Sequence, residues 1–137
     1  MPLRDPWNPD THAVLIVPAG RGARSQAWEC RAYHCQNRRA IRPCRWIAFY
    51  EKGEIDTLAE IDGTPEDDVI MSARPELAML AALTRQSNGG PDEPHTLIRL
   101  GKPGRVGPIK NARGDPFQNY RYTTLDALRS ARFTHEL

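Results

Sequence analysis

Apolar residues in this chain gather in short runs that glycine, proline and charged residues separate. Three of these runs predict buried strands, because they are continuous or rich in branched and aromatic side chains; they span residues 12–17, 45–50 and 95–100. The strand at 45–50 is followed by a tight turn at Gly53, which can take the positive φ that a hairpin needs. The pattern therefore favours hairpin-connected strands.

Two further strands are expected from weaker patterns. Residues 28–34 alternate between apolar and polar positions, which places Trp28 and Tyr33 on opposite faces of a strand. Residues 55–61 return from the turn as the partner of 45–50. Their apolar positions break strict alternation, so we expect a bulge or an irregular register there.

Leucine spacing predicts a helix over residues 75–86, which Pro75 opens and the segment at 87–91 ends. Thr123 and Asp126 fit a capping box and predict a short helix near the end of the chain. Residues 101–108 are rich in glycine and proline and predict an irregular basic loop. We expect one domain over 1–137, with 1–11 as an extended arm.

Five or six strands, hairpins and two helices without a strand-helix-strand rhythm are typical of an α+β fold. We expect a small, strongly curved and mainly antiparallel sheet, or a small β-barrel, with two short flanking helices.

The chain has 137 residues, and 39% of them are hydrophobic, which is enough for one compact core. No run is long enough to span a membrane, and the first residues lack the apolar stretch of a signal peptide. Three cysteines do not make a secreted disulfide framework. We therefore expect a cytoplasmic protein with no membrane partner.

The formal charge of +2 conceals a strong segregation along the chain. Residues 21–45 hold seven arginines and one acid, and residues 99–113 hold five basic residues and no acid. Residues 51–93 hold eleven acids and three basic residues. A basic face on a nearly neutral protein indicates a polyanionic partner.

Nucleic acid, RNA or DNA, is the partner that this pattern predicts, because the arginine fork fits phosphate and aromatic rings stack on bases. The turn at Gly20–Arg24 is expected to hold a backbone phosphate. The predicted nucleic-acid-binding residues are Arg21, Arg24, Arg31, Arg38, Arg39, Arg42, Arg45, Lys102, Arg105 and Lys110. The predicted base-stacking residues, which would hold a modified or flipped base, are Trp28, Tyr33 and Trp46.

Catalysis is a second hypothesis. His34 lies among arginines and aromatics and is a candidate general base in a small nuclease of the toxin or phage-defence type, working with Arg38 or Arg39. The carboxylates at Glu54, Asp56, Glu60 and Asp62 share one face of the predicted strand and offer a two-metal platform, although a solvated face explains the same alternation.

Zinc binding and protein binding are two further hypotheses. His34 and the three cysteines supply the atoms that zinc uses, but the spacing fits no paired-cysteine motif. We therefore predict no metal and no cofactor. The acidic 51–68 region and the leucines of the predicted helix suit a protein-interaction or inhibitor module.

A family resemblance rests on residues 42–55, which read Arg-Pro-Cys-Arg-Trp-Ile-Ala-Phe-Tyr-Glu-Lys-Gly-Glu-Ile, and on Ala59-Glu60-Ile61. This basic-proline lead, aromatic strand, short turn and returning strand resemble segments of PUA-like domains, a group that includes ASCH, EVE and SRA-type modules. The resemblance implies a small β-barrel with flanking helices that binds RNA or reads modified bases in DNA, commonly without catalysis.

Overall fold

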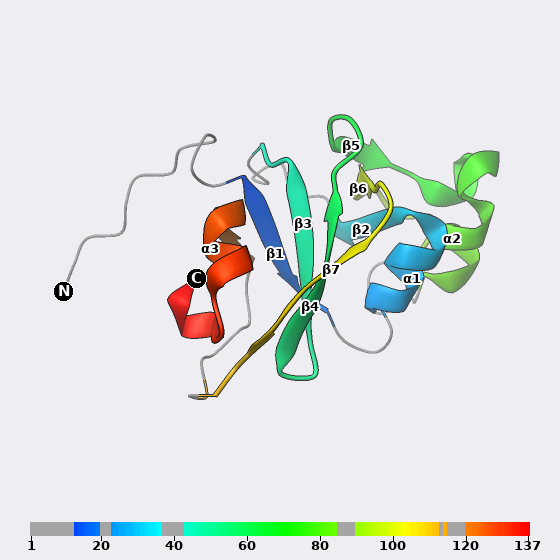
Figure 1. Cartoon of the computed structure of the whole chain (residues 1–137). Coiled ribbons are helices and arrows are strands. Elements are labelled where there is room, and N and C mark those ends of the chain that lie inside the picture. Colours follow the sequence, from blue (N-terminus) through cyan, green and yellow to red (C-terminus); the bar gives the residue numbers. More distant parts are fainter. Residues whose placement is uncertain (1–12, 20–22, 37–42, 85–89, 113, 115–119) are drawn as a thin grey trace. The chain divides into compact units, whose positions relative to one another are not determined.

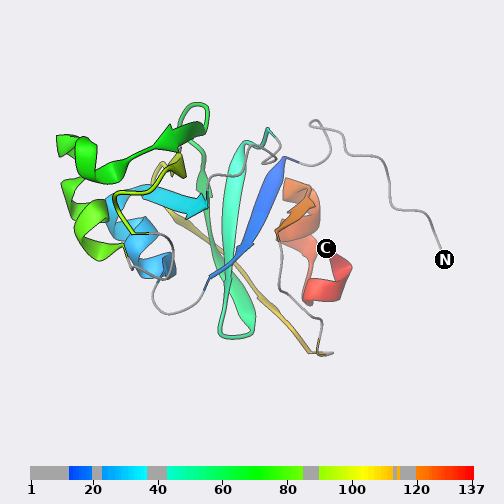
Figure 2. The same ribbon diagram turned by 180° about the vertical axis from the view of Figure 1, so that it is seen from behind.

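The computed structural model describes residues 13–19, 23–36, 43–84, 90–112, 114 and 120–137. Contacts divide the chain into two compact units. Unit 1 comprises 1–18, 42–58 and 104–137, and unit 2 comprises 19–41 and 59–103. Figures 1 and 2 show the elements of both units from opposite sides.

Unit 1 is built on a five-stranded sheet with the order β7-β4-β3-β1-β8. The strands are β1 (Val14–Pro18), β3 (Trp46–Glu51), β4 (Glu54–Glu60), β7 (Gly104–Lys110) and β8 (Arg121–Thr123). Strand β1 runs parallel to β3 and antiparallel to β8, and β7 runs antiparallel to β4. The sheet is thus mixed, with one parallel pair at its centre.

The core of unit 1 lies between this sheet and helix α3 (Leu125–Ser130). Leu128 of the helix is fully buried together with Ile16, Ile55 and Ile109 of three strands. Thr124 caps the start of the helix, because its hydroxyl accepts a hydrogen bond of 2.9 Å from the amide of Ala127. The predicted C-terminal helix is confirmed, but its cap lies one residue later than the sequence indicates. The 3-10 turn η4 (Thr134–Glu136) follows it.

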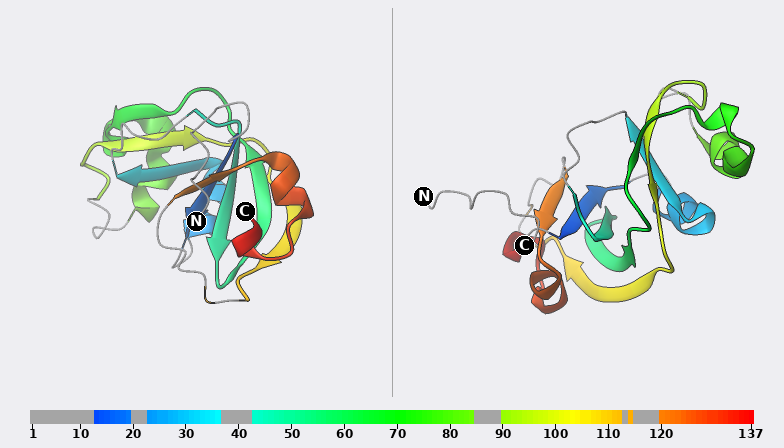
Figure 3. Two further views of the ribbon diagram at one scale, coloured as in Figure 1. Left: turned by 90° about the vertical axis from the view of Figure 1, so that its left-hand side faces the viewer. Right: turned by 90° about the horizontal axis from the view of Figure 1, so that it is seen from above.

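Unit 2 contains a three-stranded antiparallel sheet with the order β2-β6-β5. The strands are β2 (Ala32–Gln36), β6 (His95–Arg99) and β5 (Glu66–Val69). Its helical segments are α1 (Ala23–Cys30), α2 (Ala78–Leu83) and the 3-10 turns η1 (Met71–Ala73) and η2 (Pro75–Leu77). Ala32, Leu97 and Leu80 meet in one buried cluster, so α2 packs against one face of this sheet. Figure 3 gives two further views of the same elements.

The α+β prediction is confirmed, with the described strands arranged in two sheets and not in one closed barrel. Among the described helices, none is long and apolar enough to cross a membrane.

Three element predictions need correction. Residues 28–30 belong to helix α1, because alanine, glutamine and glutamate favour a helix and a seven-residue alternation does not exclude one. The predicted loop at 101–108 is largely strand β7, since pairing with β4 overrides its glycines and prolines. The helix expected from Pro75 is split into η2 and α2, and it ends at Leu83. The end of that prediction, at 85–86, lies outside the described residues.

Candidate nucleic-acid interface

Four predicted phosphate-binding residues, Arg21, Arg38, Arg39 and Arg42, lie outside the described residues, as do the glycines of the predicted phosphate turn. The described candidates divide between the two units. Unit 2 holds Arg24, Trp28, Arg31, Tyr33, His34 and Lys102, and unit 1 holds Arg45, Trp46, Arg105 and Lys110. Each unit is therefore considered as a surface of its own.

Strand β7 carries two of the exposed basic residues that the structure describes in unit 1. It is the outermost strand at one edge of the five-stranded sheet, and Arg105 and Lys110 are both exposed on it. Buried Ile109 fastens the strand to the core opposite Ile55 of β4, and the register shifts between Ile55 and Thr57. The strand is consequently held on one side, while its basic side chains reach solvent.

Gly107 makes this strand possible. Its φ is +66°, and a Cβ atom built there would lie 2.4 Å from the amide nitrogen of Ile109. Only glycine fits this position without displacing the backbone. Pro108 follows it, and proline is tolerated in a sheet mainly on an edge strand.

Arg45 and Trp46 stand at the start of β3. Their amides both donate to the carbonyl of Ala13, over 2.8 and 3.0 Å, which fixes the entry into the strand. The Arg45 side chain is exposed, whereas Trp46 is partly buried and packs against the unit 1 core. Arg45 is therefore available to a ligand, and Trp46 has a structural role in addition to the stacking role predicted for it.

Helix α1 brings an arginine and an aromatic together in unit 2. Arg24 and Trp28 are four residues apart, a spacing that places both on one side of a helix. Both side chains are partly buried. Tyr33, also partly buried, lies on the neighbouring strand β2. The helix thus replaces the predicted strand and the end of the predicted turn, and it places Arg24 and Trp28 on one side of α1.

Arg31 joins α1 to β2 in a left-handed conformation, with φ of +53°. Its side chain is exposed, and its carbonyl accepts a hydrogen bond of 2.8 Å from the amide of Leu100. Glycine normally occupies this position after a helix. The structure therefore places an exposed arginine where glycine would make the folded protein more stable.

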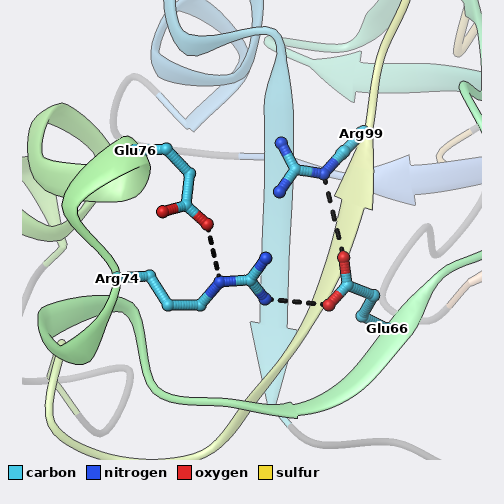
Figure 4. Close-up of polar contacts among 4 residues, drawn as sticks. All are labelled: Glu66, Arg74, Glu76 and Arg99. Carbon is cyan, nitrogen blue, oxygen red and sulfur yellow. Dashed lines mark hydrogen bonds and ion pairs between the residues drawn. The ribbon is translucent and has the colours of Figure 1, made fainter.

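A chain of four alternating charges crosses the surface of unit 2 (Figure 4). Arg74 donates from Nε to Glu76 and from Nη1 to Glu66, each over 2.8 Å. The other oxygen of Glu66 lies 3.8 Å from Nε of Arg99. These hydrogen bonds raise the pKa of Arg74, with the one to Glu66 as the largest cause. Glu66 thus accepts a hydrogen bond from Arg74 and lies within ion-pair distance of Arg99.

The sequence pattern does not reveal this ion-pair network. Arg99 belongs to the basic stretch at 99–113, but nothing in the spacing of Arg74 and Glu66 predicts that β5 brings them to β6. Arg99 lies opposite Ala32 in the β2–β6 pair, and Ala32 directly follows Arg31. Unit 2 therefore gathers basic residues at one end of this pair, and we call them the unit 2 basic group: Arg31, Arg74, Arg99 and exposed Lys102.

His34, the candidate general base, is partly buried on β2. Burial, and then the neighbouring His95, lower the pKa of His34 from its usual value to about 4. The two rings meet edge to face with centroids 5.0 Å apart. At neutral pH this imidazole is uncharged.

The hydrogen bonds of Thr84 indicate the tautomer of His34. The Thr84 hydroxyl donates to the carbonyl of Leu80 over 2.7 Å, so it accepts from Nε2 of His34 over 3.3 Å. Nδ1 of His34 then carries the lone pair, is buried, and has no hydrogen-bond partner among the described residues.

In the described residues, no three histidine, cysteine, aspartate or glutamate side chains lie close enough together to hold a metal ion. These residues therefore give no support to the metal-binding hypotheses. Cys30, Cys35 and Cys44, all among the described residues, form no disulfide. Burial raises the pKa of Cys44 to about 12, and burial followed by Glu29 raises the pKa of Cys30. Cys30 and Cys44 are therefore protonated at neutral pH.

Two crystal structures are similar to most of this chain. The ASCH protein from Zymomonas mobilis matches it with a TM-score of 0.59 at 14% identity, over 84% of this chain and 90% of that one. A mutant form of the Zymomonas mobilis protein gives a TM-score of 0.59 at 13% identity, over 85% of this chain and 92% of that one. The chain has an ASCH-type, PUA-like fold. No protein-family model and no curated protein matches the sequence.

The ASCH-type fold confirms the resemblance seen in residues 42–55 and 59–61, and the described part of these stretches includes β3 and most of β4, which are neighbours in the five-stranded sheet. At 13–14% identity the likeness concerns the fold alone. The functional assignment therefore depends on the side chains of this chain itself.

Proposed function

We propose that this protein is an RNA-binding module that holds the phosphate backbone of a single strand on exposed arginine and lysine side chains. The observation that carries the proposal is the basic edge strand β7 on an ASCH-type fold. Arg105, opposite Thr57 of β4, and Lys110, opposite Glu54, are exposed there, and residues 99–113 themselves contain no acid. PUA-like domains often bind RNA, which favours RNA as the ligand.

The unit 2 basic group supports the proposal as a second surface. Arg31 and Lys102 are exposed, and Arg74 and Arg99 both lie within ion-pair distance of the Glu66 carboxylate, an anion that a phosphate could replace. Partly buried Trp28 and Tyr33 are the proposed base-stacking residues of this unit. Reading of a modified or flipped base is an extension of this role.

Salt dependence tests the proposal directly. Each lysine or arginine that neutralises a phosphate of single-stranded nucleic acid contributes about 0.7 to the slope of log affinity against log salt concentration. We expect labelled single-stranded RNA to bind with a steep slope in fluorescence anisotropy, and Arg105→Gln to reduce that slope by about 0.7. DNA of the same sequence shows whether the ribose matters.

Arg129→Gln is the matched control, because it removes one exposed arginine from helix α3 of the same unit. It should leave the slope close to that of the wild type. Equal slopes for Arg105→Gln and Arg129→Gln, or no binding of RNA at low salt, would exclude β7 as the binding surface. Gel analysis of the RNA after each titration distinguishes binding from cleavage. The nuclease hypothesis requires shortened RNA products with the wild type and intact RNA with His34→Ala.

A further inference from the structure

Phe133 is a large aromatic side chain that lies at the surface of unit 1. It is 37% exposed, and it follows the exposed Arg132 at the start of η4. A single exposed apolar residue is ordinary in a soluble protein. Phe133 is not single, however, because its ring stacks on that of His135, with centroids 5.7 Å apart and planes inclined by only 11°. Two exposed rings therefore lie almost parallel at this surface.

The turn that carries the two rings is firmly anchored. Thr134, between them in the sequence, is buried, and Leu137 packs against the core of unit 1. One carboxylate oxygen of Glu136 accepts hydrogen bonds from the amides of Arg132, over 3.0 Å, and Phe133, over 2.9 Å. The rings are therefore held in place before any ligand arrives, so that little conformational entropy is lost when a planar group stacks on them.

Strand β7 places a basic side chain beside Phe133. Lys110, the last residue of β7, pairs with Phe133 in a parallel bridge, and its amide donates to the carbonyl of Arg132 over 3.0 Å. Residues paired in a bridge direct their side chains to the same side of the sheet. Lys110 is also opposite Glu54 of β4, but neither Lys110 nor Arg132 forms an ion pair with a carboxylate of the described residues. Both cations are therefore available next to the rings.

Exposed rings beside cations are typical of surfaces that bind single-stranded nucleic acid, where bases stack on the rings and phosphates lie on the basic side chains. We propose that Phe133 and His135 form a base-stacking platform that takes an unpaired base of RNA. The phosphates next to that base lie on Lys110 and Arg132. This inference rests on the RNA-binding function proposed above and names the rings that contact the base. Trp46, the stacking residue that the sequence predicts in unit 1, is instead partly buried against the core.

Two labelled probes distinguish stacking from charge. One is an oligoadenylate RNA, and the other is an abasic ribose-phosphate chain of the same length, which keeps the phosphates and lacks the bases. The full chain should bind the oligoadenylate more tightly in fluorescence anisotropy. Phe133→Ser should weaken binding of the oligoadenylate about fivefold or more, because a base loses its stacking partner. It should leave affinity for the abasic chain and both salt slopes unchanged, because it removes no charge.

Further variants show whether the ring itself is responsible. Leucine keeps the apolar bulk without an aromatic face, so Phe133→Leu should lose the preference for oligoadenylate, whereas Phe133→Tyr should keep it. Met79→Ser removes a more exposed side chain (56%) from unit 2 and should leave both affinities unchanged. Lys110→Gln should instead reduce the salt slope by about 0.7 for both probes, because it removes a phosphate contact.

Four results would overturn the platform. If the wild type binds both probes equally and with a steep salt slope, no base stacks, and the RNA-binding proposal alone survives. Oligoadenylate binding by Phe133→Ser or Phe133→Leu that equals that of the wild type would exclude the ring. Absence of binding to either probe at low salt would remove RNA binding and the platform together. Sedimentation that shows a wild-type dimer and a monomeric Phe133→Ser would assign the ring to self-association.

Discussion

His34 and His95 lie edge to face on neighbouring strands of unit 2, with ring centroids 5.0 Å apart. His95 donates from Nδ1 to the carbonyl of Glu93 over 2.8 Å, and it is 1% exposed. A proton added to Nδ1 of His34 would enter a buried position with no acceptor among the described residues, next to a second imidazole. The pair is therefore stable only while His34 is neutral.

This relationship predicts that the protein loses stability in mild acid. The folded-state pKa of His34 is about 4, below its usual value of 6.5. Above pH 6.5 His34 is neutral in both the folded and the unfolded protein, so the stability that the neutral imidazole contributes is fully present there. Between pH 6.5 and 4 the unfolded chain binds a proton that the folded chain does not, so the free energy of unfolding falls, by roughly 3 kcal/mol at most. Urea titrations at a series of pH values measure this.

His34→Gln tests the assignment, because glutamine does not titrate. Its free energy of unfolding should change much less between pH 6.5 and 4 than that of the wild type. His135→Gln, at an exposed histidine of η4, should keep the wild-type dependence. If both variants follow the wild type, His34 is not the group responsible.

Arg31 predicts opposite effects on stability and on RNA binding. Its left-handed backbone, with φ of +53°, costs a side-chain-bearing residue more than it costs glycine. Arg31→Gly should therefore raise the free energy of unfolding by up to about 1 kcal/mol. It should also weaken RNA binding, because an exposed basic side chain is lost.

Lys52→Asn is the control for Arg31→Gly. Lys52 also has a φ of +53°, in the turn before Gly53, where asparagine followed by glycine suits the hairpin. This variant should gain stability without a comparable loss of RNA affinity. A less stable Arg31→Gly with unchanged RNA binding would show that the arginine has no role in the interface.

The sequence predicts the strands that bury continuous apolar runs. It predicts less accurately the strands that form only because another strand pairs with them. Strands β1, β3 and β6 lie close to their predicted positions. Their continuous apolar runs, which include the fully buried Val14, Ile47 and Ile98, remove side chains from water only when both faces of the strand are covered. Strand β5 has no comparable signal, since it consists of Glu66, two aspartates and a valine and exists through pairing with β6. Local composition carries no information about such a partner.

The candidate site shows the same division. Charge segregation indicates a basic surface, and Arg105 and Lys110 are exposed as that pattern requires. Its geometry could not be predicted, because glycine and proline at 101–108 favour a loop until β4 is available as a partner. The pairing of Arg74 with Glu66 joins residues from different elements, so neither periodicity nor spacing reveals it.

The cap of helix α3 gives a stability prediction that distinguishes Thr124, the cap in the structure, from Thr123, the cap that the sequence predicts. The Thr124 hydroxyl, and not that of Thr123, accepts the amide hydrogen of Ala127. Thr124→Ala should lower the free energy of unfolding by about 1 kcal/mol, and Thr124→Ser should restore most of it, since serine caps helices equally well. Urea denaturation measures both. If the free energy of unfolding of Thr124→Ala equals that of the wild type, this cap contributes nothing to stability.

Glu66 predicts a gain of function within the proposed RNA-binding role. Its carboxylate occupies Arg74 and approaches Arg99, so it competes with any phosphate for the same two guanidinium groups. Glu66→Gln should strengthen binding of single-stranded RNA and steepen its salt dependence. The cost in stability should be small, because exposed ion pairs contribute little.

The comparison variant is Glu60→Gln, which removes one exposed carboxylate from β4 and changes the net charge equally. If the gain came from net charge alone, the two variants would bind RNA with the same affinity and salt slope. A larger gain in Glu66→Gln, abolished when Arg74→Gln is added, would instead show that the freed guanidinium contacts phosphate. The triple comparison therefore decides whether the unit 2 basic group is part of the RNA-binding surface or only holds β5 to β6.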